Sequence, residues 1–423
     1  MKVKLSDVCV EGGVQTGPFG AQLHQSDYSE WGTPVCMPVN LVDGSISENG
    51  IARVSEEHVE RLSRYKVRRG DLLYARRGDV GRGSLVGAHE DGWLCGTGCL
   101  KVTPDPSKID SRYLFYLTSL PETIGWLVNH AKGTTMLNLN TTILSSLPLV
   151  IERNLEKQRR IAEVLSAYDE LIENSRRQIK LLEEAAQRLY KEWFIDLKFP
   201  GHETAPIVDG LPEGWKRLSL REYLVSHIGG GWGKEFSESS YPVRAAVIRA
   251  TDIEAIRNGN VKGTPVRWHA ESNFQKRKLE PGDIVFEVSG GSKETGVGRS
   301  LLITEEVLSM FDSPVICASF CKRMHLAESA DSALLYWKIR NDYKTGLIRK
   351  YEKSSAGNII NFLWEDFLDG YELLVPSDRI KEQFESAASL YSKKLGTCCM
   401  RISFAREARD RLLPKLMSGE IEV

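Results

Sequence analysis

The chain has 423 residues, of which 41% are hydrophobic and 27% are charged, and its formal net charge is −1. This length exceeds what one ordinary hydrophobic core supports, so about two to four folded units are expected. The sequence has no apolar leader and no run of roughly 18 apolar residues, which indicates a cytoplasmic rather than a membrane protein. The near-zero net charge excludes a uniformly basic surface but allows local basic clusters.

The first half consists of short apolar runs separated by turns. A Gly-Pro-Phe-Gly turn at Gly17–Gly20 precedes the polar side chains of Gln22 and His24. The apolar run Leu72–Ala75 is bounded by Gly-Asp and Arg-Arg steps, which is typical of a buried strand. The stretch Ser111–His130 is expected to be helical. Together these elements predict a mixed α/β globule.

Basic residues gather in the same region. Between Arg61 and Arg82 there are eight Lys and Arg residues against two Asp. Arg76, Arg77 and Arg82 lie in glycine-rich loops, which let the backbone approach a partner closely, and arginine pairs bidentately with guanine or phosphate. A polar loop before the last apolar run of this half carries Lys132, Thr134, Thr135 and Asn138.

The second half repeats this order. Gly282-Asp283 repeats Gly70-Asp71 after 212 residues, and Ile284–Glu287 predicts a strand like the first. A second helical stretch is expected at Ser332–Tyr351. The related loops carry Lys293, Arg299, Lys353, Ser354, Ser355 and Asn358, and the glycine run at 229–235 adds Lys234.

Two long amphipathic segments follow the two globules. Between Ile161 and Trp193 apolar residues alternate spacings of four and three without Gly or Pro, which predicts a coiled-coil seam. The seam from Ile380 to Leu416 is less regular, and Gly396 with the following cysteines is expected to interrupt its middle. The simplest partner for each seam is the other helix, and an approximate two-fold axis between the repeats would make them antiparallel.

This organisation predicts a tandem α/β duplicate in the shape of a dumbbell. We expect a first globule over residues 1–152, a central helix over 153–197, a second globule over 198–376 and a C-terminal helix over 377–423. About forty helical residues span roughly 60 Å, or about seventeen base-pair steps. The helices could therefore act as a ruler on DNA, or simply as a dimerisation or scaffold element.

No known catalytic or nucleotide-binding motif occurs in the sequence. The glycine run at 229–235 lacks the phosphate-loop spacing, and the histidines lack metal-ligand spacing. Two cysteine pairs, Cys95 with Cys99 and Cys317 with Cys321, could hold zinc, but small residues on buried strands are the simpler interpretation. The interpretation that remains is a non-catalytic binding protein.

Several motifs together resemble the specificity subunit of type I restriction-modification enzymes. They are "TGPFGAQLHQSDYSEWGTPV", the central "EKQRRIAEVLSAYDELIENSRRQIKLLEEAAQRLYKEWF", "LPEGWK" and the closing "LLPKLMSGEIEV". The resemblance implies two target recognition domains that read the halves of a bipartite, asymmetric DNA site, with helices that set their separation.

The resemblance also implies partners and cofactors. Modification subunits, expected to be two, would carry S-adenosylmethionine and methylate adenine, and restriction subunits would use ATP and Mg²⁺, while this chain would bind no cofactor. The alternative is a protein-interaction scaffold with two binding modules on a coiled-coil bar. Under the first interpretation the candidate DNA contacts are the polar and basic residues named above.

Overall fold

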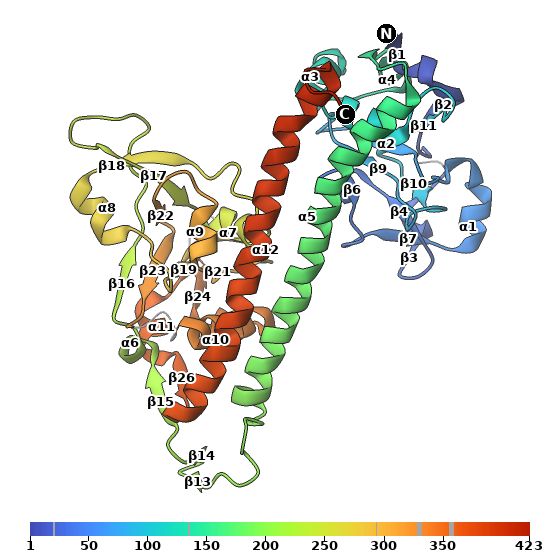
Figure 1. Ribbon diagram of the computed structural model, residues 1–423. Helices are drawn as coiled ribbons and strands as arrows, with labels where there is room; N and C mark the ends of the chain where they lie inside the picture. Colours follow the sequence, from blue (N-terminus) through green and yellow to red (C-terminus); the bar gives the residue numbers. More distant parts are fainter. Residues whose placement is uncertain (20–21, 134–135, 293, 328–331, 355–358) are drawn as a thin grey trace. The chain divides into compact units, whose positions relative to one another are not determined.

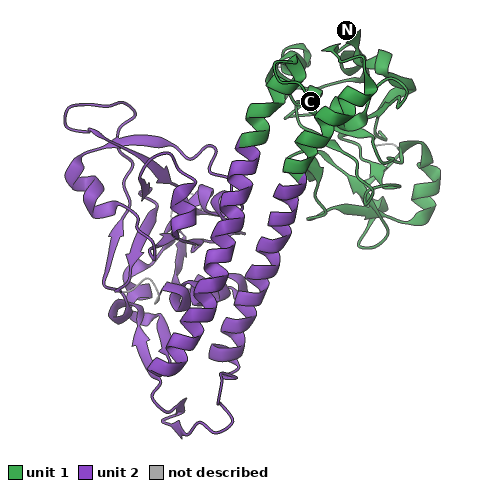
Figure 2. Cartoon of the chain, in the orientation of Figure 1, with its two compact units in different colours: residues 1–169, 408–423 green, residues 170–407 purple. Residues whose placement is uncertain are grey.

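The computed structural model describes the chain except residues 20–21, 134–135, 293, 328–331 and 355–358. The chain divides into two compact units, residues 1–169 with 408–423 and residues 170–407 (Figure 2). Each unit contains a mixed α/β globule and part of two long helices, which confirms the predicted fold class. Among the described helices, none is long and apolar enough to cross a lipid bilayer.

Unit 1 is built on two small sheets (Figure 1). The first has the antiparallel order β2-β11-β8-β9, with bounds Cys9–Thr16, Cys99–Pro104, Leu72–Ala75 and Gly83–Leu85. The second has the order β10-β4-β7-β3, with bounds Leu94–Cys95, Thr33–Cys36, Ala52–Val54 and Tyr28–Ser29. Short pairs join β1 (Lys2–Lys4) to β12 (Pro148–Val150) and β5 (Leu41–Val42) to β6 (Ser45–Ile46).

The helices of unit 1 are short. They are η1 (Leu5–Val8), η2 (Gln25–Asp27), η3 (Pro38–Asn40), α1 (Glu56–Arg61), η4 (Ser63–Tyr65), α2 (Ser111–Thr118), α3 (Pro121–His130) and α4 (Thr141–Ser145). The single helix expected over Ser111–His130 is therefore two helices. Pro121 occupies the first turn of α3, where its missing N–H costs nothing, and it disfavours helical backbone in the residue before it.

Unit 2 contains the matching sheets. The first has the antiparallel order β16-β23-β19-β21, with bounds Ser226–Gly229, Cys321–His325, Ile284–Glu287 and Ser300–Leu302. The second has the order β18-β17-β22, with bounds Val266–His269, Val243–Ile248 and Val315–Cys317. The remaining strands are β15 (Lys216–Ser219) paired with β26 (Glu372–Val375), β20 (Ser289–Gly291), β25 (Ile360–Phe362) and β24 (Glu352–Ser354) in a third sheet, and the hairpin β13 (Ile207–Val208) and β14 (Leu211–Pro212).

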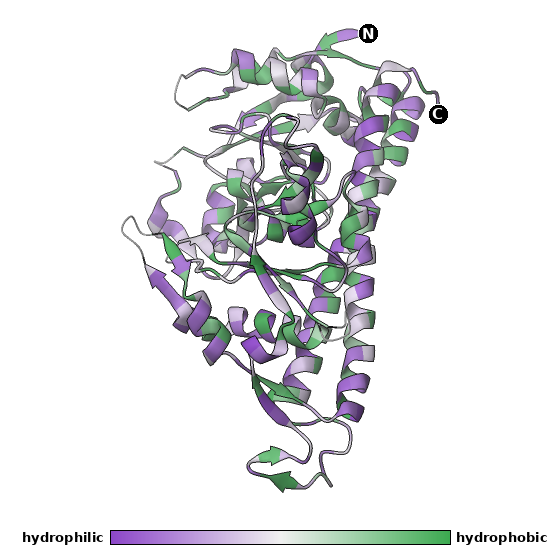
Figure 3. Cartoon of the chain, turned by 90° about the vertical axis from the view of Figure 1, so that its left-hand side faces the viewer, coloured by the Kyte–Doolittle hydropathy of each residue, from purple (hydrophilic) through white to green (hydrophobic). Residues whose placement is uncertain are grey.

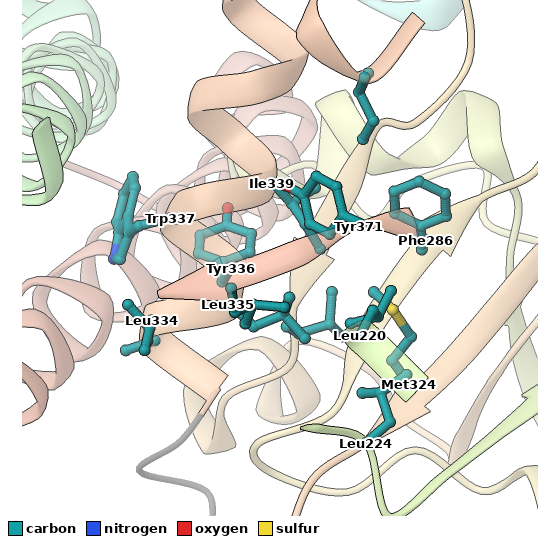
Figure 4. Close-up of a cluster of buried hydrophobic side chains, with 14 of the residues drawn as sticks. Leu220, Leu224, Phe286, Met324, Leu334, Leu335, Tyr336, Trp337, Ile339 and Tyr371 are labelled. Atoms are coloured by element: carbon teal, nitrogen blue, oxygen red, sulfur yellow. The ribbon is translucent and has the colours of Figure 1, made fainter. Parts of the chain in front are cut away.

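Short helices also connect the strands of unit 2. They are α6 (Leu220–Tyr223), η6 (Ala250–Asp252), α7 (Ile253–Arg257), α8 (Glu271–Arg277), α9 (Glu305–Ser309), α10 (Ser332–Thr345), η8 (Leu347–Tyr351) and α11 (Trp364–Gly370). The helix expected over Ser332–Tyr351 breaks at Gly346, whose φ of +76° ends α10. Its aromatic and aliphatic side chains pack with Phe286, Met324 and Tyr371 in the core of this unit (Figure 4).

The central strand pairings of the two globules match, as the internal repeat predicts, although unit 2 has an additional sheet, β20-β25-β24. The order β2-β11-β8-β9 corresponds to β16-β23-β19-β21, and both sheets are antiparallel throughout. The parallel strand pair β4–β10 corresponds to the parallel pair β17–β22, and the antiparallel pair β1–β12 corresponds to β15–β26. Equivalent positions can therefore be assigned from hydrogen-bond register rather than from sequence similarity.

The two long helices are α5 (Leu155–Tyr190), extended by the π-helical turn η5 (Lys191–Ile195), and α12 (Asp378–Ser418). Hydrophilic and hydrophobic segments alternate along both (Figure 3). In unit 1, Ile161 and Leu165 share a core with Leu413 and Leu416. In unit 2 the Cys398 thiol lies 3.4 Å from Gln178 Oε1, and the rings of Phe194 and Phe384 are 4.8 Å apart. The helices are thus antiparallel within unit 2, as predicted.

The expected interruption of the second helix at Gly396 is wrong. Helix α12 continues through Gly396, Cys398 and Cys399 without a break. A Cβ atom at Gly396 would lie 2.8 Å from Thr304 Oγ1, so the glycine allows close approach of α9 to the helix. The thiol of Cys399 donates to Arg257 O at 3.1 Å. These small residues therefore serve helix packing.

Candidate nucleic-acid interface

The repeated Gly-Asp step forms the same turn before the same strand in each unit. Gly70 and Gly282 have φ angles of +92° and +96°, a region that favours glycine. Asp71 Oδ2 accepts from Arg68 N at 2.8 Å, and Asp283 Oδ2 accepts from Glu280 N at 2.7 Å. Both aspartates are buried, and burial raises the pKa of Asp71. The repeated Gly-Asp motif is thus a structural turn that precedes β8 in unit 1 and β19 in unit 2.

Arg76 and Arg77 directly follow strand β8 and lie beside the hairpin that Lys132 and Asn138 form. Arg76 N donates to Gly98 O at 2.8 Å, and Arg76 O accepts from Leu139 N at 2.8 Å. Lys132 and Asn138 exchange two backbone hydrogen bonds of 3.0 and 2.7 Å, and Arg77 forms a bridge to Asn138. The structure therefore brings Arg76, Arg77, Lys132 and Asn138 together, with Arg77 and Lys132 exposed to solvent.

Several polar atoms of this cluster have no hydrogen-bond partner within the described residues. They are Arg76 Nε, Arg82 Nε and Asn138 Oδ1, although all three atoms are buried. Arg76 Nη1 lies 3.4 Å from Thr16 Oγ1, and Arg82 Nε lies 3.6 Å from Asp79 Oδ2. Buried polar groups are normally paired, so these three atoms are candidates for hydrogen bonds to ordered water or to a ligand that reaches the cluster.

Gln22 and His24 lie in the loop that follows β2. Gln22 Oε1 accepts from Tyr65 Oη at 2.7 Å and from Phe19 N at 3.2 Å, so its side chain braces the turn. His24 is exposed, and its backbone N donates to Asp27 Oδ2 at 2.9 Å. Of these two residues, His24 is the one whose side chain is accessible to a ligand.

The equivalent region of unit 2 is built differently. Glu287, which replaces Ala75, is fully buried and accepts from Arg299 Nε at 2.8 Å and from Arg299 Nη2 at 2.5 Å. This pairing raises the pKa of Arg299 and ties its guanidinium to the protein. Lys353 and Ser354 are exposed on β24. Lys234 is also exposed, and its Nζ lies 4.0 Å from Glu238 Oε1.

Some predicted contacts lie outside the described residues, and one equivalent residue was missed. The former are Thr134, Thr135, Lys293, Ser355 and Asn358. Asn361, which was not predicted, pairs with Lys353 and Ser289 as Asn138 pairs with Lys132 and Arg77. Ser289 Oγ donates to Asn361 Oδ1 at 2.6 Å. The Asn in "MLNLN" and the Asn in "IINFL" could have revealed this equivalence.

The cysteines lie on buried elements, as the simpler interpretation predicts. Cys95, Cys99, Cys317 and Cys321 are buried on β10, β11, β22 and β23. Burial raises the pKa of Cys317 to about 12, so its thiol stays protonated at neutral pH. Within the described ranges no group of three or more His, Cys, Asp and Glu side chains is placed to hold a metal ion.

Comparisons with known proteins agree with this architecture. Residues 2–184 match the type I restriction modification DNA specificity domain. The type I restriction enzyme MjaIX specificity subunit of Methanocaldococcus jannaschii is 26% identical over 325 residues, or 74% of this chain and 69% of the relative. A putative type I specificity subunit of Mycoplasma pneumoniae is 31% identical over 184 residues, or 40% of this chain and 45% of the relative.

A solved structure shares the fold. The crystal structure of a type I restriction-modification S subunit from M. genitalium aligns over 99% of this chain and 96% of that chain, with a TM-score of 0.60 at 16% identity. The chain thus shares its fold with that S subunit. Residues 2–184 thus form a type I restriction modification DNA specificity domain, and the chain is similar to type I specificity subunits over 74% of its length.

Proposed function

We propose that the chain is the DNA-reading, non-catalytic subunit of a type I restriction-modification complex, and that each globule reads one half of a bipartite, asymmetric target. The observation that carries this proposal is the duplicated sheet with its strand-end hairpin, Lys132–Asn138 in unit 1 and β24–β25 in unit 2. Both hairpins combine exposed lysine with an asparagine, and asparagine can pair bidentately with adenine.

In unit 1 the basic side chains supply affinity as well as base contacts. Arg77 and Lys132 are exposed, and Arg76 and Arg82 have donors that lack partners within the described residues. Arginine and lysine bind phosphates and release counterions, so binding should weaken steeply as salt rises. A guanidinium that reaches a groove can also pair with guanine O6 and N7. Unit 2 would rely on Lys234, Lys353 and Asn361 instead of Arg299.

The long helices would set the distance between the half-sites. Helix α5 is continuous over 36 residues and α12 over 41. At 1.5 Å per residue, α5 spans roughly 54 Å. A stiff helical pair of that length suits a target whose two specific parts are separated by a fixed number of unread base pairs.

The proposal extends to partners that supply the chemistry. Two modification subunits would carry S-adenosylmethionine and methylate adenine, and restriction subunits would use ATP and Mg²⁺ to translocate and cut DNA. This chain would hold no cofactor of its own and would act in the cytoplasm, where the DNA lies. The motifs for these reactions are absent from its sequence, which supports a division of labour between subunits.

Selection from a random DNA library tests the proposal directly. The full chain, assembled with its modification subunits, is incubated with duplexes of random sequence, about 40 base pairs long, at about 0.15 M salt, and the bound fraction is sequenced. We expect a motif of two specific parts with a constant gap. If the assembled complex enriches no motif, the DNA-reading function is wrong and the scaffold alternative is favoured.

A further inference from the structure

The two units present an aromatic side chain at the same position beside the candidate interface. Gly17 N donates to Cys99 O at 3.0 Å in unit 1, and Gly230 N donates to Cys321 O at 3.0 Å in unit 2. Cys99 pairs with the last residue of β8, and Cys321 pairs with the last residue of β19, so the two glycines are equivalent. Two residues further along the chain lie Phe19 and Trp232.

Both turns are held tightly against the neighbouring backbone. A Cβ atom at Gly17 would lie 1.9 Å from Gly96 O, and one at Gly230 would lie 2.2 Å from Ala318 O, so neither position accommodates a side chain. The sequence pattern is glycine, any residue, aromatic, glycine in both copies. Each aromatic residue therefore follows an anchored glycine at the same spacing of two residues.

Each ring lies beside a guanidinium and remains open to solvent. Phe19 is 53% exposed, and its ring centroid is 5.5 Å from Arg76 Cζ. Trp232 is 43% exposed, and its ring is 5.1 Å from Arg267 Cζ. Arg76 follows β8, whereas Arg267 lies on β18, so non-equivalent arginines build the same pair. A lone exposed aromatic residue needs no explanation, but this matched arrangement does.

We propose that Phe19 and Trp232 each make apolar contact with a nucleobase of the half-site that their own unit reads. This inference rests on the proposed function and adds two residues to it. An exposed ring offers a flat apolar surface that suits a thymine methyl group in the major groove, or the face of a base that is unstacked from the duplex. The neighbouring Arg76 or Arg267 can bind a phosphate or a guanine at the same place. The rings would thus contribute base preference without adding charge.

The test uses the full chain assembled with its modification subunits and the duplex enriched by selection. For Phe19→Ala and for Trp232→Ala we expect the Kd for this duplex to rise about tenfold, the range that loss of one base–aromatic contact produces. The slope of log Kd against log salt should stay unchanged, because neither ring releases a counterion. Repeated selection should lose base preference in one part of the motif for Phe19→Ala and in the other part for Trp232→Ala.

Three control variants separate this role from a structural one. Phe19→Tyr and Trp232→Phe keep a flat ring and should bind nearly as the unchanged protein does. Trp31→Ala removes a ring that is 81% exposed and lies just before the start of β4. The Gly17 turn lies at the other end of β4, because Gly17 packs against Gly96, and Gly96 N donates to Cys36 O at the end of that strand. Trp31→Ala should therefore leave binding unchanged.

The outcomes distinguish this inference from the proposed function. If Phe19→Ala and Trp232→Ala keep both the affinity and the motif while Arg76→Ala weakens binding, the aromatic contacts are wrong and the DNA-reading function stands. If Trp31→Ala weakens binding as much as Phe19→Ala does, the effect is not specific to the turn and the inference is also wrong. If the unchanged complex selects no motif, both proposals fail together.

Discussion

The Arg299 guanidinium donates two hydrogen bonds to the fully buried carboxylate of Glu287, at 2.8 and 2.5 Å. Its equivalent in unit 1 is Arg82, because Arg82 O accepts from Ala75 N as Arg299 O accepts from Glu287 N, and Arg82 only approaches the exposed Asp79 at 3.6 Å. The same motif position is therefore held in a buried ion pair in unit 2 and is only loosely paired in unit 1. The two copies of the fold thus hold the equivalent arginine differently.

This difference predicts unequal effects on stability. Glu287→Ala or Arg299→Ala leaves a partner of a buried pair without its counter-charge, so the free energy of unfolding of unit 2 should fall by about 3 kcal/mol. Arg82→Ala should cost less than about 0.5 kcal/mol, because its pairing is loose and partly exposed. Urea unfolding of the full chain measures each value. A loss for Arg82→Ala equal to that for Arg299→Ala would contradict the assignment.

The basic residues of unit 1 should control salt-dependent binding. Arg76→Ala and Arg82→Ala should each weaken DNA binding by the assembled complex and flatten its dependence on salt, because each removes a potential phosphate contact. Fluorescence anisotropy over a salt series measures both effects. Arg53→Ala is the matched control, since Arg53 Nη2 pairs with Glu48 Oε2 at 2.9 Å in the other sheet. Unchanged binding and slope for both interface variants would remove these two residues from the interface.

Two helical glycines should respond in opposite directions to alanine. A Cβ atom at Gly125 in α3 would meet no other atom within 4 Å, so Gly125→Ala should stabilise by about 0.5–1 kcal/mol through helix propensity. Gly396→Ala should instead destabilise by about 1 kcal/mol or more, because its Cβ would lie 2.8 Å from Thr304 Oγ1. Thermal unfolding compares them. Stabilisation by both substitutions would show that α9 does not approach α12 closely.

Two histidines of unit 2 should make the protein less stable in mild acid. Burial lowers the pKa of His227 and of His269 in the folded state, and His227 Nδ1 accepts from Trp364 Nε1 at 3.3 Å. A lowered folded pKa gives stability that is complete above the unfolded pKa of about 6.5 and is lost as the pH falls below it. Urea unfolding from about pH 7.5 to about pH 5.5 should show this loss, with a smaller loss for His227→Gln. An equal loss of unfolding free energy in His227→Gln would show that His227 does not contribute to the acid sensitivity.

The central helix should set the gap between the half-sites. Four residues inserted into α5 add roughly 6 Å, or nearly two base-pair steps, so the selected motif should gain about two unread base pairs. The same four residues inserted after Thr204, in the loop beyond η5, provide the control and should leave the gap unchanged. An unaltered gap in the helix variant would mean that α5 is not a ruler.

Local sequence patterns predicted the helices and strands better than they predicted which strands pair with each other. The strands Leu72–Ala75 and Ile284–Glu287 and the long α5 followed directly from apolar periodicity and turn residues. The pairing of β2 with β11 could not be predicted, because it joins segments more than eighty residues apart and leaves no local signal. Pro121 and Gly346 divided helices that periodicity alone would continue.

The candidate site shows the same limit. The sequence predicts that basic loops cluster near Arg76. It does not predict the ion pair between Arg299 and Glu287, because these residues lie on opposite sides of a loop and are twelve positions apart in the sequence. The hairpin of unit 2 has two more residues between its paired Lys353 and Asn361 than that of unit 1 has between Lys132 and Asn138. This difference in length explains why Asn361 was overlooked. Register in three dimensions, rather than composition, defines which residues correspond.

The most direct test of the central claim is single-molecule methylome sequencing of cells that express this chain with its modification subunit, compared with cells that lack only this chain. The account predicts a new bipartite methyl-adenine motif that depends on the chain and whose two parts are separated by a constant gap. Absence of any new motif, with assembly of the complex demonstrated, would contradict the claim that this chain directs the complex to DNA.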